Sequence, residues 1–430
     1  MAQEFGRMMY HWAVDLFPIC RSITGNGARQ TLRYLEELVS GLRIYEVPSG
    51  TRAFDWAVPD EWNIEDAYVL NKKGERVIDF RKNNLHVVGY SEPVDLELSL
   101  EELKTRLFTL EDQPDAIPYV TSYYERRWGF CLAWNDLQKL RPGRYRAVIK
   151  STLAPGMLTY GELILPGREE KEILLSTYIC HPSLGNEISG PVVTIALVRW
   201  LQSLPDRRYT YRIVFVPETI GSIVYLSRNL DVMKRNTVAG FVITCVGDEH
   251  GYSLMPTRVG NTLADRVARH VLLHHALGYK SYSFLERGSD ERQYCSPFVD
   301  LPVVSIMRSK YGTYPEYHTS LDNLDLISPA GLQGAYEAIQ KCLYALEHNV
   351  RWRATVPCEP QLGKRGLHPT ISYKGSATDT REMMNLLAYA DGEHDLIALG
   401  DRIGLPADHC QEIASKLAAQ GLLEAVAEVL

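Results

Sequence analysis

Four short apolar runs alternate with helix-length segments in the second half of this chain. The runs are rich in Val, Ile and Leu and cover residues 172–179, 209–216, 239–246 and 301–307. Between and after them lie predicted helices near residues 191–203, 221–230, 262–275 and 330–347. Continuously apolar strands separated by helices are typical of a mainly parallel sheet with helices on both faces. The sequence therefore predicts an α/β fold.

Polar residues that can bind metals follow each of these predicted strands. The carboxyl ends of parallel strands meet at one edge of the sheet, about 5 Å apart, so these side chains can converge there. Zinc binds imidazole and carboxylate groups, and a two-metal site needs several of them within ~4 Å. The candidate metal ligands at this edge are His181, Asn186, Glu187, Glu218, Asp248 and His318.

The same regions contain four motifs, HPSLGNEISGP, PETIGS, GSDERQY and YPEYHTSLDNLD. They resemble a bacterial branch of the zinc aminopeptidase-like family, the co-catalytic zinc group that includes bacterial leucyl aminopeptidases and glutamate carboxypeptidase II. The resemblance covers nearly the whole chain. It implies an inserted β domain, a C-terminal winged-helix-like domain and, for some members, genes near those of polysaccharide biosynthesis.

The resemblance also implies roles for individual residues. His181 matches the first histidine ligand, His318 matches the second, and Asp248 matches the carboxylate after the third strand. Glu218 lies where the family has a Glu-Glu pair, one a base and one a ligand. Here that pair reads Pro217-Glu218, so one of the two roles is vacant.

A second departure from the family concerns the aspartate that bridges two metals, three residues before a Ser-Gly. That position is Asn186 in this chain, and a neutral amide bridges two cations poorly. Either Glu187 replaces the aspartate or the site holds a single metal. We therefore expect one or two Zn²⁺ ions.

These residues would support hydrolysis of an amide bond by a zinc-activated water. Glu218, or Glu187 if Glu218 is a ligand, would act as the general base. Tyr294 and Arg308 are candidates to stabilise the oxyanion, and Asp290 could recognise an amine or support a ligand. The expected substrate is a small peptide or an N-acyl metabolite.

Changes in composition and apolar periodicity along the chain predict three domains. Residues 1–53 and 168–350 form the aminopeptidase-like domain, residues 54–167 form an inserted β-rich domain, and residues 357–430 form a winged-helix-like domain. The insert is rich in aromatic residues, which could wall a substrate cleft, mediate dimer contacts or form the insert's own core. A homo-oligomer through the insert or the C-terminal domain is left open.

The composition of the chain indicates the cellular compartment in which the protein is expected. The N-terminus lacks the pattern of a signal peptide, and no apolar stretch approaches the ~20 residues of a membrane span. The eight cysteines are scattered without a CxxC pair, which fits a reducing compartment. We therefore expect a cytoplasmic protein without membrane partners.

Three alternatives compete with the hydrolase hypothesis. A cysteine hydrolase based on Cys180 is disfavoured because His181 should leave the strand on the opposite face. A DNA-binding regulator is disfavoured because residues 381–430 hold nine acidic against three basic residues, so we expect no nucleic-acid partner. The third alternative is a degenerate site, marked by Asn186 and Pro217, that binds a peptide or glycan without cleaving it.

Overall fold

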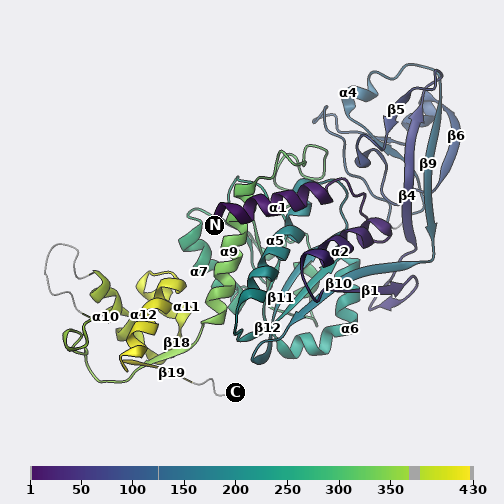
Figure 1. The fold of residues 1–430 in the computed structure, drawn as a ribbon. Helices are drawn as coiled ribbons and strands as arrows, with labels where there is room; N and C mark the ends of the chain where they lie inside the picture. Colours follow the sequence, from purple (N-terminus) through teal and green to yellow (C-terminus); the bar gives the residue numbers. More distant parts are fainter. Residues whose placement is uncertain (1, 124, 368–377, 427–430) are drawn as a thin grey trace. The chain divides into compact units, whose positions relative to one another are not determined.

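The computed structural model describes residues 2–123, 125–367 and 378–426 (Figure 1). Its contacts divide the chain into two units. The first unit comprises Met1–Gly260 and Lys280–Tyr336, and the second comprises Asn261–Tyr279 and Glu337–Leu430.

An eight-stranded sheet organises the first unit. In spatial order its strands are β1 (Arg43–Pro48), β10 (Met157–Leu165), β12 (Tyr209–Val216), β11 (Glu169–Tyr178), β13 (Thr237–Val242), β16 (Val303–Met307), β14 (Ser253–Met255) and β15 (Lys280–Ser281). The central strands β12, β11, β13 and β16 are parallel. Strand β10 pairs antiparallel with β1 and β12, and β14 pairs antiparallel with β16 and parallel with β15. The mainly parallel α/β sheet is therefore confirmed, and its central strands are the four predicted ones.

The helices of the first unit are α1 (Ala2–Leu16), α2 (Asn26–Leu38), α5 (Gly185–Ser203), α6 (Ile220–Asn236), η2 (Phe284–Glu286), α8 (Glu291–Tyr294) and α9 (Pro329–Glu347), which continues into the second unit. Three of them, α5, α6 and α9, cover the predicted segments 191–203, 221–230 and 330–347, and α5 begins six residues earlier than predicted, whereas η2 and α8 were not predicted. Helix α5 is buried along most of its length, which its nearly all-round apolar sequence permits.

Two glycines let the first turns of α5 approach the sheet closely. A Cβ atom at Gly190 would lie 2.3 Å from the carbonyl oxygen of Ile243, and one at Gly185 would lie 2.2 Å from that of Asn323. Any larger residue would push the helix outward. The glycines thus fix the position of Asn186 and Glu187, which lie between them in the sequence.

The insert contains a four-stranded sheet of its own, in the order β5-β4-β9-β6. Its elements are β2 (Arg52–Ala53), β3 (Trp56–Ala57), β4 (Glu61–Leu70), β5 (Arg76–Asp79), η1 (Asn84–His86), β6 (Val94–Ser99), α3 (Leu100–Lys104), β7 (Leu107–Phe108), β8 (Phe130–Cys131), α4 (Trp134–Leu137) and β9 (Arg144–Ala154). The predicted insert, residues 54–167, also includes β10, which belongs to the eight-stranded sheet.

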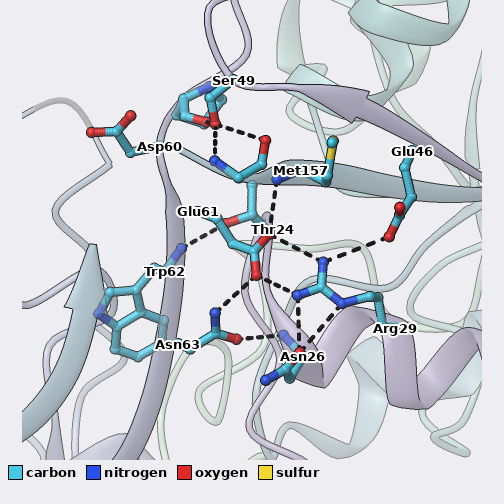
Figure 2. A network of polar contacts seen from close by, with 12 residues as sticks. Thr24, Asn26, Arg29, Glu46, Ser49, Asp60, Glu61, Trp62, Asn63 and Met157 are labelled. Carbon is cyan, nitrogen blue, oxygen red and sulfur yellow. Dashed lines mark hydrogen bonds and ion pairs between the residues drawn. The ribbon is translucent and has the colours of Figure 1, made fainter. Parts of the chain in front are cut away.

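A polar network joins the start of the insert to the main domain (Figure 2). The Glu61 carboxylate on β4 accepts hydrogen bonds from Arg29 of α2, from the Asn63 side chain (2.8 Å) and from the Met157 backbone N–H of β10 (2.8 Å). The Asn26 backbone N–H donates to the Asn63 side chain at 2.7 Å. One carboxylate thus connects three elements from both parts of the unit.

The second unit combines helices with a three-stranded sheet in the order β18-β17-β19. Its elements are α7 (Leu263–His275), the end of α9, β17 (Arg351–Ala354), η3 (Gly363–Arg365), α10 (Thr378–Tyr389), β18 (Asp391–Asp395), α11 (Leu396–Ile403), α12 (Ala407–Ala419) and β19 (Leu423–Val426).

The apolar periodicity of residues 380–430 predicts helices followed by at most a short wing. This prediction is wrong at β18, which interrupts the helices. Its sequence, DGEHD, has no apolar alternation to signal a strand. The predicted loop of residues 357–374 ends outside the described residues. No helix within the described ranges has the length and apolarity needed to cross a membrane.

Candidate metal centre

Four predicted site residues converge at the carboxyl edge of the eight-stranded sheet. His181 follows β11, Glu187 lies in the first turn of α5, Glu218 follows β12, and His318 lies in the loop after β16. Glu187 Oε2 lies 3.6 Å from His181 Nδ1, and Glu187 Oε1 lies 3.7 Å from His318 Nε2. Glu218 Oε2 lies 3.6 Å from His181 Nε2.

The group formed by His181, Glu187 and His318 fits a metal ion. One ligand atom from each of the three lies within 4.8 Å of the other two. Glu187 is 3% exposed, yet its Oε1 atom has no hydrogen-bond partner among the residues that the structure describes. A buried carboxylate oxygen without a partner is costly unless something satisfies it. Two imidazoles and one carboxylate are also a ligand set of catalytic zinc sites.

The protonation states of the two histidines in this group suit a cation. Burial lowers the pKa of His181 well below its usual range and lowers the pKa of His318 to about 4, so both rings are neutral, which is the form that binds metals. Burial raises the pKa of Glu187 to about 8, against the opposing hydrogen bond from Tyr178. The Tyr178 hydroxyl contacts both Glu187 and Thr244 and so orients this carboxylate.

A second group, Cys180 with His181 and Glu218, shares one histidine with the first. The Glu218 backbone N–H donates to the Cys180 sulfur at 3.2 Å, and burial raises the pKa of this thiol well above its usual range. A protonated thiol is neither a good ligand nor a nucleophile. His181 Nδ1 does lie 3.7 Å from the sulfur, because the strand ends before these residues, so the expectation of opposite faces is wrong.

Aromatic rings fix His318. The Tyr317 ring stacks on it with centroids 3.8 Å apart, and Tyr119 of the insert meets it edge-on at 5.0 Å. The Tyr119 backbone N–H also donates to the His318 carbonyl at 2.8 Å. His318 has a φ of 56°, a strained conformation that persists only where surrounding contacts enforce it.

Asn186 and Asp248 were predicted as ligands, but the structure does not bring them into this group. The Asn186 side-chain amide donates to Asp248 Oδ2 at 3.0 Å. The other Asp248 oxygen accepts from the Ser309 hydroxyl at 3.0 Å and from the His250 backbone N–H at 2.9 Å. Both side chains are thus occupied with protein partners.

The predicted oxyanion donors also lie elsewhere. The Tyr294 hydroxyl is buried against the Ser176 hydroxyl at 2.8 Å. Arg308 donates to the Asp248 carbonyl at 2.8 Å. Asp290 accepts from the Thr219 backbone N–H (2.8 Å), which places it behind the Glu218 loop. Neither Tyr294 nor Arg308 is among the described residues that line the cavity at this centre.

That cavity has a volume of about 270 Å³ and is bounded by His181, Glu218 and His318 on the sheet side. Tyr119 and Tyr123 of the insert form another wall, and their hydroxyls are 2.9 Å apart. Some aromatics of the insert therefore do line a cleft, while others, such as Trp62, are in the core.

Sequence reasoning missed Arg292, which also lines the cavity. Its guanidinium donates to the Thr219 hydroxyl at 2.6 Å, and its Nε atom is buried without a hydrogen-bond partner. Arg292 is part of the GSDERQY motif, two positions after Asp290. Its place in this motif could have identified it as a site residue.

Comparison with protein families gives two matches. Residues 10–349 match the family described as a domain of unknown function, DUF4910. Residues 350–425 match a winged helix-turn-helix family. A Clostridium acetobutylicum protein, provisionally named a polysaccharide biosynthesis protein with an aminopeptidase-like domain, is 44% identical over 99% of this chain and 98% of its own length.

Solved structures agree with these matches. A provisionally assigned peptidase from Clostridium acetobutylicum is 43% identical, with a TM-score of 0.93 over 99% of this chain and 97% of that one. A zinc aminopeptidase from Bacillus subtilis shares the fold, with a TM-score of 0.59 and 12% identity over 80% of this chain and 95% of that one. The expected zinc aminopeptidase-like fold with a winged helix is confirmed.

Proposed function

Because the chain belongs to the DUF4910 family and carries an aminopeptidase-like domain, we propose that it is a zinc-dependent hydrolase of amide bonds. The observation that carries the proposal is the buried, partnerless Oε1 of Glu187, placed between two neutral histidines. His181, Glu187 and His318 would hold the ion. When bound, zinc polarises a carbonyl group and lowers the pKa of a water molecule to about 7.

Glu218 is the proposed general base. Its Oε2 lies 3.6 Å from His181 Nε2, and the residue lines the cavity. Burial raises the pKa of Glu218 well above its usual range, and Asp290 adds to that effect. A carboxylate with a raised pKa can accept a proton from water at Oε2 and donate it to the leaving amine.

The cavity limits the size of the substrate group. Its volume of about 270 Å³ is at the lower end of the range for small-molecule pockets. The two tyrosines of the insert supply flat apolar walls with hydroxyl groups at their tips. A free amino-terminal residue or an N-acyl group on a small metabolite or modified sugar suits this space. The name of the Clostridium acetobutylicum relative refers to polysaccharide biosynthesis. This name favours a modified sugar as the substrate.

A second candidate function follows from the hydrogen bond between Asn186 and Asp248. An amide occupies the position where the resemblance implies a bridging carboxylate. In this alternative the domain is a degenerate aminopeptidase-like protein that binds a peptide or glycan without cleaving it.

Metal content and turnover, measured on one preparation, separate the two candidates. The purified protein is analysed by plasma mass spectrometry and assayed on aminoacyl and N-acetyl chromogenic substrates with and without a chelator. The hydrolase proposal expects about one zinc per chain and chelator-sensitive turnover, both lost in His181→Ala and His318→Ala. His11→Ala, which alters an exposed histidine of α1, is the matched control. Metal-free protein that stays inert after zinc is added would support the binding alternative.

A further inference from the structure

A second cluster of histidines belongs to the second unit, whereas the residues of the candidate metal centre belong to the first. A cavity of about 230 Å³ is lined by residues of α7, α9 and α12, among them His270, His274, Lys341 and Asp408. All of them belong to the second unit. The proposed hydrolysis makes no use of this cavity.

A carboxylate orients the ring of His270. Its side chain is 1% exposed, and its Nδ1 atom lies 2.6 Å from Asp401 Oδ1. A carboxylate only accepts hydrogen bonds, so this contact places a proton on Nδ1, and the lone pair of the neutral ring is then on Nε2. The Nε2 atom is buried and has no hydrogen-bond partner among the described residues. A carboxylate behind a histidine is the usual outer support of a metal-binding imidazole.

His274 presents a second such nitrogen one helical turn later. Its Nε2 is also buried without a hydrogen-bond partner, and the two ring centroids are 5.0 Å apart. Residues four apart on a helix lie on the same face. Burial lowers the pKa of His274, and the neighbouring His270 adds to that effect. Two orphaned imidazole nitrogens therefore line one cavity.

We propose that His270 and His274 form a second metal site, for a divalent transition ion such as Ni²⁺, Cu²⁺ or Zn²⁺. Imidazole nitrogen suits these ions, whereas Mg²⁺ and Ca²⁺ prefer oxygen. The cavity has room for several water ligands, since each water occupies about 30 Å³ in the liquid. The Asp408 carboxylate on the cavity wall is 2.8 Å from the Lys341 ammonium group, so this pair adds no net charge near the ion and the two imidazoles are the proposed ligands.

Such an ion would connect two segments from different family matches. His270 and His274 belong to α7, within the DUF4910 region, whereas Asp401 and Asp408 belong to the winged helix-turn-helix region. A metal held by the two histidines and supported by Asp401 would stabilise their packing within the second unit.

Calorimetric titration of the full, metal-stripped chain with Ni²⁺ tests the proposal. We expect a binding step that is lost in His270→Gln and in His274→Gln but kept in the matched control His11→Gln. Asp401→Asn keeps both ligands and should weaken this step by roughly 10- to 100-fold. This Ni²⁺-binding step should persist in His181→Ala. The test of the second site therefore does not depend on whether the proposed hydrolase centre binds metal.

Unchanged Ni²⁺ binding in both histidine variants would overturn the proposal and leave bridging water as the occupant. His270→Gln removes the contact with Asp401 and could disturb folding, which circular dichroism would reveal. In that case His274→Gln is the decisive variant. The His274 Nε2 atom has no hydrogen-bond partner among the described residues, so this substitution removes no hydrogen bond of that atom. Loss of the step in folded His274→Gln protein supports the site.

Discussion

The side-chain amide of Asn186 donates a 3.0 Å hydrogen bond to Asp248 Oδ2, and its oxygen accepts one of 3.0 Å from the Gly247 backbone N–H. Both ends of the amide are thus satisfied by the protein. Asp248 is 1% exposed and is likewise bonded to neighbouring groups. This pair stands where a second metal would need an additional carboxylate, which favours one metal per chain.

Replacing Asn186 with aspartate should change the metal count. Asn186→Asp puts a second carboxylate beside Asp248, so the metal-free protein loses a hydrogen bond and about 1–3 kcal/mol of unfolding free energy. An added cation would relieve the repulsion. We expect zinc content to rise from about one to about two per chain, measured by plasma mass spectrometry alongside thermal melts.

Asn186→Ala is the control for that experiment, because it removes the same hydrogen bond without adding charge. It should lower stability and leave the zinc content unchanged. A single zinc in Asn186→Asp protein that is nonetheless destabilised would argue against a latent second position.

Glu218→Gln separates a base from a ligand. If Glu218 acts only on the proton, the variant should keep its zinc and lose about 10²- to 10⁴-fold in turnover. Glutamine has nearly the same shape, so the backbone hydrogen bond to the Cys180 sulfur should survive. Zinc content and kcat measured on the same sample check this expectation. Loss of the metal together with activity would assign Glu218 as a ligand.

A buried ion pair in the main sheet should be sensitive to removal of one partner. Arg212 on β12 donates two 2.7 Å hydrogen bonds to Glu172 on β11, and both side chains are less than a tenth exposed. Glu172→Ala leaves the buried guanidinium with Glu162 at 3.3 Å and the Tyr225 hydroxyl at 2.7 Å as its remaining partners. We expect a cost of about 3 kcal/mol in urea unfolding, at the lower end of the range for breaking a buried ion pair. Asp95→Ala, which breaks the half-exposed pair with Arg146, should cost no more than about 1 kcal/mol.

The polar network of Figure 2 should make the unfolding free energy decrease as the pH falls. Burial tends to raise the pKa of Glu61, but the hydrogen bonds from Arg29, Asn63 and Met157 outweigh it and lower the pKa. The contribution is therefore present above the unfolded-state pKa of about 4.3 and is lost as pH falls through the lower folded-state value. Below about pH 4.3, the Tm of Glu61→Gln should therefore fall less steeply with decreasing pH than the Tm of the unaltered protein.

Glu101→Gln, which alters a carboxylate that is 81% exposed, serves as the control for the acid melts. Its profile should follow that of the unaltered protein. Identical acid profiles for Glu61→Gln and the unaltered protein would contradict the role assigned to this network.

The sequence predicted the parallel strands because their apolar runs are long and are bounded by turn residues. It also predicted that His181, Glu218 and His318 meet at one edge of the sheet, and the structure brings them together there, since parallel strands have their carboxyl ends at one edge. It could not decide between Asn186 and Glu187. That choice depends on where α5 begins, and the close approach of Gly185 and Gly190 to distant backbone sets the answer.

Other features of the site depend on contacts that no local pattern encodes. Tyr294 was a candidate oxyanion donor as part of the GSDERQY motif, but it ends helix α8 and its hydroxyl contacts that of Ser176 within the core. Tyr119 and Tyr123 reach the cavity from the insert, far away in the sequence. Side-chain direction within short loops such as these is fixed by tertiary packing rather than by periodicity.

The pairing of the insert with the His318 loop has a consequence for folding order. The Tyr119 N–H bonds to the His318 carbonyl, the Ser320 N–H bonds to the Ile117 carbonyl, and the Ile117 N–H returns to the Ser320 hydroxyl across 203 residues of sequence. Contacts between such distant segments form late, because closing a long loop costs entropy before any contact compensates it. We therefore expect His318, the proposed second histidine ligand, to reach its final position only near the end of folding, after the insert has folded against its loop.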